Sequence, residues 1–149
     1  MAAQLLTELE EMPNARATRD YAWRLAEMVR TAVASGDVAL AERLVNGVEP
    51  LFPLHEHALC AARAILAEAA AEHRDAAALY AEAAERWQQF GFVAERAEAL
   101  LGRGRCLVAL GEPGAEEPLS EARELFASMG HRSALDETQA LLEQTAARR

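Results

Sequence analysis

Small apolar residues recur along the chain at a spacing typical of helices. Three sets of positions follow the order i, i+4, i+7, which places their side chains on one face of a helix. The sets are Ala41, Val45 and Val48; Ala77, Ala81 and Ala84; and Ala115, Leu119 and Ala122. Their first members lie 36 and 38 residues apart. This period predicts stacked helical hairpins rather than a single closed core.

Glycine, proline and polar residues between the apolar stripes predict where the helices end. Gly36 suits the left-handed end of one helix, and Asp37 suits the cap of the next. The turn of the second hairpin is expected at His73 and Arg74. The predicted segments are a short helix at 2–11, antiparallel hairpins at about 18–49, 54–90 and 93–129, and a capping helix at about 134–147 opened by Ser133 and Asp136.

These segments predict one all-α domain over residues 1–149, an α-α superhelix of about three hairpins closed by the last helix. Composition agrees, because 35 residues are alanine while valine, isoleucine and threonine are scarce. Alanine also lets helix backbones approach closely. Cys60 and Cys106 fall in apolar stripes and are expected to be buried rather than to form a disulfide.

Charge narrows the classes of partner. The formal net charge is −9, and an acidic surface repels phosphate backbones, so direct nucleic-acid binding is disfavoured. No stretch is apolar enough to span a bilayer. The N-terminal residues carry Glu8, Glu10 and Glu11 and lack the layout of a signal peptide. We therefore expect a soluble, cytoplasmic protein with no membrane contact.

Two segments resemble the second half of a tetratricopeptide repeat. In one, the Gly36-Asp37 turn is followed by Ala41, Val48 and Pro53. In the other, the run Leu110-Gly111-Glu112 is followed by Ala115, Leu119 and Ala122. The resemblance covers about residues 20–130 as three hairpins. It implies a solenoid that binds other proteins, with the first helix of each hairpin lining a concave groove.

A narrower resemblance concerns residues 90–129. The runs at 90–97, 100–107 and 118–126 are similar to the C-terminal repeats of large bacterial ATPase-type transcription regulators and cyclase-linked signalling proteins. This resemblance implies the regulatory or sensor part of a larger protein. The chain itself contains no Walker lysine motif, and none of the parent enzymes' activities is carried over.

The groove implied by the first resemblance would contain Trp23, Arg30, Arg63 and Arg105. Neighbouring positions expected on the same face are Glu27, Leu59, Glu98 and Leu101. Arginines beside an indole can bind an acidic or C-terminal peptide through forked hydrogen bonds and aromatic contact. The alternative is a solvated face of mixed charge, with Trp23 buried against the N-terminal helix.

No set of residues predicts catalysis, a cofactor or a metal. The segment Gly102-Arg103-Gly104 lies inside a predicted helix, so its glycines indicate close packing rather than a nucleotide loop. His55 and His57 would point in different directions on a helix. The glutamates lie beside arginines, as in Glu82 and Arg86, which is typical of a solvated face.

Three hypotheses follow for function. The first is a non-catalytic scaffold that contacts a protein, a peptide, other domains of a parent protein, or a second copy of the chain. The second is a metabolite sensor with its ligand between hairpins. The third, an enzyme, would need two converging carboxylates in a deep pocket.

Overall fold

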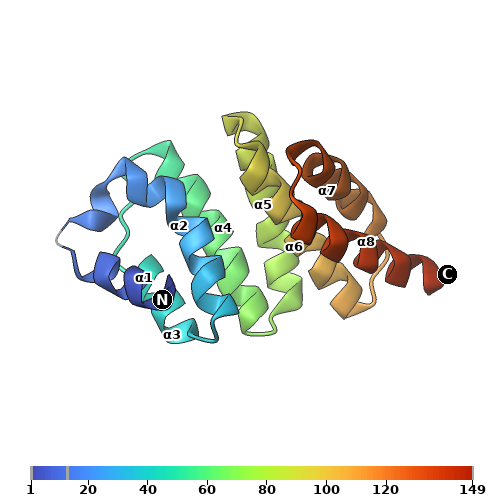
Figure 1. Ribbon diagram of the computed structural model, residues 1–149, viewed down its shortest axis with the longest axis horizontal. Helices are drawn as coiled ribbons and strands as arrows, with labels where there is room; N and C mark the ends of the chain where they lie inside the picture. The colour runs from blue at the N-terminus through green and yellow to red at the C-terminus, as the bar shows by residue number, and fades with distance from the viewer. Residues whose placement is uncertain (1, 13, 149) are drawn as a thin grey trace. The chain divides into compact units, whose positions relative to one another are not determined.

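A computed structural model describes residues 2–12 and 14–148, except for the side chains of Ala2, Ala3 and Glu10. This part of the chain is all-helical and contains no strand, as the sequence predicts (Figure 1). The helices are α1 (Ala2–Glu11), the 3-10 helix η1 (Ala15–Ala17), α2 (Arg19–Ala34), α3 (Val38–Val45), α4 (Pro53–Ala69), α5 (His73–Phe90), α6 (Val93–Leu110), α7 (Glu116–Met129) and α8 (Arg132–Ala147).

The chain divides into two compact units, Met1–Ala71 and Glu72–Arg149. The division falls between α4 and α5, the two helices that the sequence pairs in its second hairpin. Each unit is described by itself. The pairing of α4 with α5, and the superhelix built on it, stay predictions.

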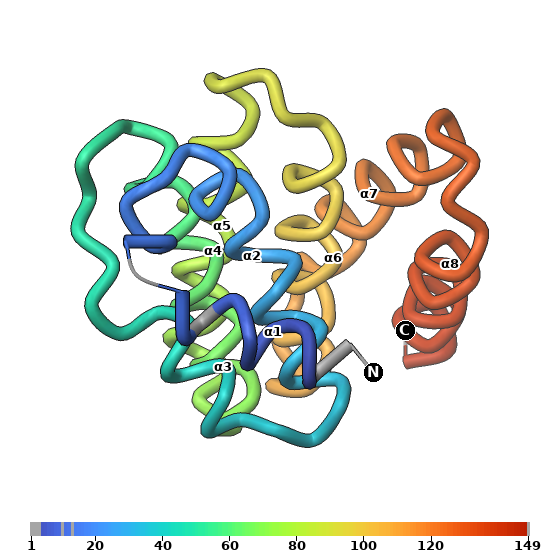
Figure 2. The backbone as a smooth tube through the Cα atoms, turned by 60° about the vertical axis from the view of Figure 1, so that its left-hand side comes forward, coloured from blue at the N-terminus to red at the C-terminus, as the bar shows by residue number. Residues whose placement is uncertain are grey.

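In the first unit α2 is the central helix. It packs most extensively against α4, then against α3, and it also contacts α1 and η1; Figure 2 shows α1 beside α3 and α2. The turn between α2 and α3 is formed as predicted: Gly36 is left-handed at φ 82°, and the Asp37 carboxylate accepts from the Leu40 N–H at 2.9 Å. Leu25, Leu40 and Leu44 have no exposed surface, so this hairpin encloses an apolar core.

Three polar side chains join the ends of η1, α2, α3 and α4. The Tyr21 hydroxyl donates to the Leu44 carbonyl at 2.6 Å, and the Arg16 guanidinium donates to the Arg43 carbonyl at 2.7 Å. Both acceptors belong to the last turn of α3, where helix carbonyls lack partners within the helix. From α4, the fully buried His55 places Nε2 3.2 Å from the Arg16 carbonyl oxygen. These bonds fix the end of the unit at which α4 begins.

In the second unit α6 packs against α5 and α7, and α7 packs against α8 (Figures 1 and 2). The glycines of α6 allow the close packing predicted for them. A Cβ at Gly102 would overlap the Tyr80 ring of α5, and one at Gly104 would overlap Leu119 of α7. Trp87 is 1% exposed and packs edge-on against Phe92, with ring centroids 5.5 Å apart. A few large side chains therefore fill the interior and pack against glycine and alanine residues.

Two of the predicted apolar stripes are displaced by one position. On α3 the buried residues are Leu40, Ala41 and Leu44. Of the predicted positions, Ala41 is therefore buried, whereas Val45 is half-buried and Val48, also half-buried, lies beyond the end of the helix. On α5 the core stripe is Ala76, Tyr80, Ala83 and Trp87. Of the predicted positions, Ala84 is buried, whereas Ala77 and Ala81 are half-buried. The third stripe, Ala115, Leu119 and Ala122, is buried as predicted. The larger side chains bury more apolar surface, so they determine which face of each helix points inward.

Two predicted helix starts are wrong. The turn before α5 lies at Ala70–Glu72, with Ala71 left-handed at φ 61°, and His73 and Arg74 belong to the helix. The last helix begins at Arg132 rather than near Ala134. Its cap is the ring of His131, whose Nδ1 accepts from the Ala134 N–H at 3.4 Å, so Ser133 is not the capping residue.

Candidate functional site

Three of the four residues predicted to line a groove lie in the first unit. Trp23 and Arg30 lie two turns apart on α2, and Arg63 lies on α4, which packs against α2. The Trp23 side chain is 46% exposed, Arg30 is half-buried and Arg63 is exposed. The alternative in which Trp23 is buried against the N-terminal helix is therefore wrong. We call Trp23, Arg30 and Arg63 the α2–α4 surface.

The fourth residue, Arg105, lies on α6 in the second unit. Its guanidinium is 3.3 Å from the Glu137 carboxylate of α8, so it forms a half-exposed ion pair within that unit. A continuous row of Arg30, Arg63 and Arg105 stays a prediction.

Two neighbours expected on the same exposed face are buried instead. Leu59 on α4 is 3% exposed and Leu101 on α6 is 1% exposed. Both are large aliphatic residues, and in each case the helix turns this side chain into its unit's core. The exposed face is therefore more polar than the sequence suggests.

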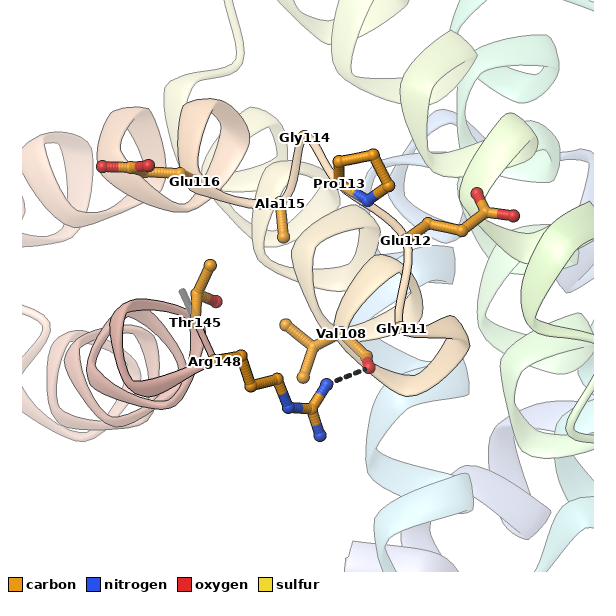
Figure 3. A pocket seen from close by; sticks show the side chains of 9 residues that line it. All are labelled: Val108, Gly111, Glu112, Pro113, Gly114, Ala115, Glu116, Thr145 and Arg148. Atoms are coloured by element: carbon orange, nitrogen blue, oxygen red, sulfur yellow. Dashed lines mark hydrogen bonds between the residues drawn. The ribbon is translucent and has the colours of Figure 1, made fainter.

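A pocket of about 340 Å³ lies at the end of the second unit where α6 and α8 finish (Figure 3). The side chains of Val108 and Ala115 face it, and the Arg148 guanidinium donates to the Val108 carbonyl at 3.0 Å. Glu112 and Glu116 border the pocket, but their carboxylates point away from it. The wall is thus largely apolar and backbone, with one guanidinium at its edge.

A second pocket, of about 250 Å³, lies in the first unit between η1 and the segment that follows α3. Met12 and Leu51 line it and are 57% and 55% exposed. Arg16 and Glu49 supply its charged groups, and Gly47 is left-handed at φ 78°. The sequence analysis did not identify this pocket, because its walls come from turns whose conformation depends on tertiary bonds such as that of Arg16.

One histidine and both cysteines are buried inside the fold. His55 is fully buried, and its ring stacks on Phe52 with centroids 5.1 Å apart. Cys60 and Cys106 are buried and are not joined in a disulfide, as predicted. In the described part of the chain no three His, Cys, Asp or Glu residues are grouped as metal ligands require.

The surface carboxylates are paired with arginines in several places. Glu82 and Arg86 form the predicted pair on α5 at 2.9 Å. Arg96 of α6 pairs with Glu121 of α7, and Arg74 of α5 lies 2.5 Å from Glu112. Exposed pairs of this kind contribute about 0–1 kcal/mol each. All of these pairs lie in the second unit, whose surface therefore carries mixed charge.

No helix in the described part of the chain has both the length and the apolar character needed to cross a bilayer. Comparisons of the chain with models of protein families, with curated proteins and with solved structures gave no match. The resemblance to tetratricopeptide repeats therefore enters the functional argument as a proposal.

Proposed function

We propose that the chain is a non-catalytic helical scaffold that binds a protein or peptide partner through the α2–α4 surface. We further propose that it serves as the regulatory or sensor repeat region of a larger bacterial signalling or transcription-regulatory protein. The observation that carries the first proposal is the exposure of Trp23, which is 46% exposed on a helix whose opposite face is closed by Leu25 and Val29.

The residue types of the α2–α4 surface support recognition of a protein. Tryptophan and arginine are the side chains most enriched where interface binding energy is concentrated. An indole offers a large, rigid contact area, and the guanidinium groups of Arg30 and Arg63 can bind carboxylates with two parallel hydrogen bonds. The preferred partner is therefore an acidic or C-terminal peptide segment with an apolar residue that covers Trp23.

Affinity capture followed by reconstitution with the purified partner tests this proposal. The variant carrying Trp23→Ala, Arg30→Glu and Arg63→Glu should bind the partner at least about tenfold more weakly. Arg123→Glu, an exposed position on α7, is the matched control and should bind like the wild type. Equal binding by the triple variant would contradict the proposal, as would a chain that neither captures a partner nor self-associates.

The pocket at the end of α6 and α8 favours one second candidate, a small-molecule sensor. Its volume of about 340 Å³ falls at the lower end of the range for ligand sites, roughly 300–1,000 Å³. A ligand at 100 times its dissociation constant adds about 2.7 kcal/mol to the free energy of unfolding. A metabolite screen by melting temperature should therefore give hits that Arg148→Ala weakens. A flat response across a broad library would exclude this candidate.

A further inference from the structure

The turn that follows α3 contains the dipeptide Asn46-Gly47. Asn46 has φ −61° and ψ 133°, and Gly47 is left-handed at φ 78°. These angles fit a type II β-turn, which is closed by the Val48 N–H donating to the Val45 carbonyl at 3.2 Å. Asn46 and Gly47 are both exposed, so water reaches the turn.

The two groups of this dipeptide that could react with each other are not held by other bonds. Within the described part of the chain, the Asn46 side-chain amide makes no hydrogen bond and the Gly47 N–H has no acceptor. A left-handed glycine after a helix commonly donates to the carbonyl four residues earlier. Here that carbonyl belongs to Arg43, and it accepts from the Arg16 guanidinium at 2.7 Å. The Asn46 amide carbon and the Gly47 nitrogen are therefore free to meet when the turn opens.

We propose that Asn46 is a site of spontaneous deamidation. The Gly47 nitrogen bonds to the Asn46 Cγ, and the side-chain amide nitrogen leaves as ammonia with the proton from the Gly47 nitrogen. Water then hydrolyses the five-membered succinimide at either carbonyl, which gives aspartate or isoaspartate. Glycine suits this step because it has no Cβ to hinder the attacking nitrogen. Ring closure requires Asn46 to rotate away from ψ 133°, which breaks the turn bond between Val48 and Val45.

Asn14, the other asparagine of the chain, is an internal control. It is also exposed, but the nitrogen that follows it belongs to Ala15, which carries a Cβ and is 8% exposed. The Ala15 N–H donates to the Met12 carbonyl at 3.3 Å, so this nitrogen is already bonded. The local structure therefore favours reaction at Asn46 over Asn14.

Deamidation changes both the charge and the backbone of the segment after α3. It adds a carboxylate near the C-terminal end of the helix, where the helix dipole disfavours negative charge. Isoaspartate also adds one methylene group to the main chain. Gly47 lines the second pocket, so the wall of that pocket changes with the reaction. The site shares no residue with the α2–α4 surface, so this proposal is independent of the proposed function.

Incubation of the purified full chain at physiological temperature and mildly alkaline pH tests the proposal. Peptide mapping by mass spectrometry follows the mass gain from replacing NH2 by OH, and an isoaspartyl-specific methyltransferase labels the isoaspartate. A synthetic peptide of residues 41–51 gives the rate of the same dipeptide without the fold. Because only the turn bond must break, the folded chain should react about two- to tenfold more slowly than this peptide.

Aspartate and isoaspartate should accumulate at position 46 and not at position 14. Asn46→Gln should abolish the labelling, because its longer side chain closes a six-membered ring far more slowly. A reaction that required global unfolding would be slower than the peptide by about a thousandfold or more, and that rate would overturn the proposal. Equal conversion of Asn14 and Asn46, or unchanged labelling of Asn46→Gln, would overturn it as well.

Discussion

At the residue scale, the structure depends on a few large side chains that lie directly on glycine. Tyr80 is 3% exposed, so its ring is enclosed and has no space to move away from Gly102. Leu119 is fully buried over Gly104 in the same way. A glycine inside a helix costs about 1 kcal/mol relative to alanine. Glycine at these two positions therefore lowers helix propensity but allows close contact between neighbouring helices.

We predict that Gly102→Ala lowers the free energy of unfolding by about 1–3 kcal/mol, because the overlap with Tyr80 outweighs the gain in helix propensity. In a Tyr80→Ala background the same change should instead raise it, by up to about 1 kcal/mol. Urea unfolding of the four proteins in this cycle measures both values. A stabilising Gly102→Ala in the wild-type background would contradict the packing described for α5 and α6.

At the element scale, helix positions follow closely from the sequence, whereas individual caps do not. The helices at 2–11 and 93–110 begin and end where the sequence predicts. Their ends carry local signals, such as the glycine after Leu110, whose conformation depends little on the rest of the fold. The sequence predicts Ser133 as the cap of α8, but the His131 ring accepts the bond from the Ala134 N–H. A histidine cap has no distinctive sequence pattern, so this choice could not be foreseen.

The two sequence-predicted caps should therefore respond differently to alanine. Asp37→Ala removes the 2.9 Å bond to the Leu40 N–H and should lower the free energy of unfolding by about 1 kcal/mol, with a range of 0.5–2. Ser133→Ala removes no capping bond and should change it by less than about 0.5 kcal/mol. Thermal or urea unfolding compares the two variants. Equal losses would show that Ser133 is also a cap.

At the scale of the whole molecule, each unit has its own core and its own pocket. The all-helical content was predicted, because it depends on alanine-rich apolar stripes that are visible in the sequence. The division after Ala71 was not predicted, since no glycine or proline marks it; the left-handed residue there is an alanine. The sequence predicted only part of the inward-facing residues of each stripe. Large side chains next to the predicted positions, such as Tyr80, bury more apolar surface and so determine which face of the helix points inward.

The candidate site was predictable in its residue types and only partly in its members. Trp23 and Arg63 are exposed, in agreement with the sequence analysis, because tryptophan among charged neighbours stands out from an apolar stripe. Leu59 was misplaced because i, i+4 spacing alone does not identify which side of α4 faces α2. The pocket at Met12 and Leu51 has no local sequence pattern. Its walls depend on tertiary bonds such as the one that the Arg16 guanidinium donates to the Arg43 carbonyl, 27 residues away.

The most direct test of the central claim is amide hydrogen exchange of the full chain, measured with and without the purified partner. The account predicts slower exchange in peptides that span Trp23 to Arg30 of α2 and those around Arg63 of α4, and no such protection in the triple variant. Protection confined to the second unit, or equal protection in the triple variant, would contradict the assignment of the binding surface to α2 and α4.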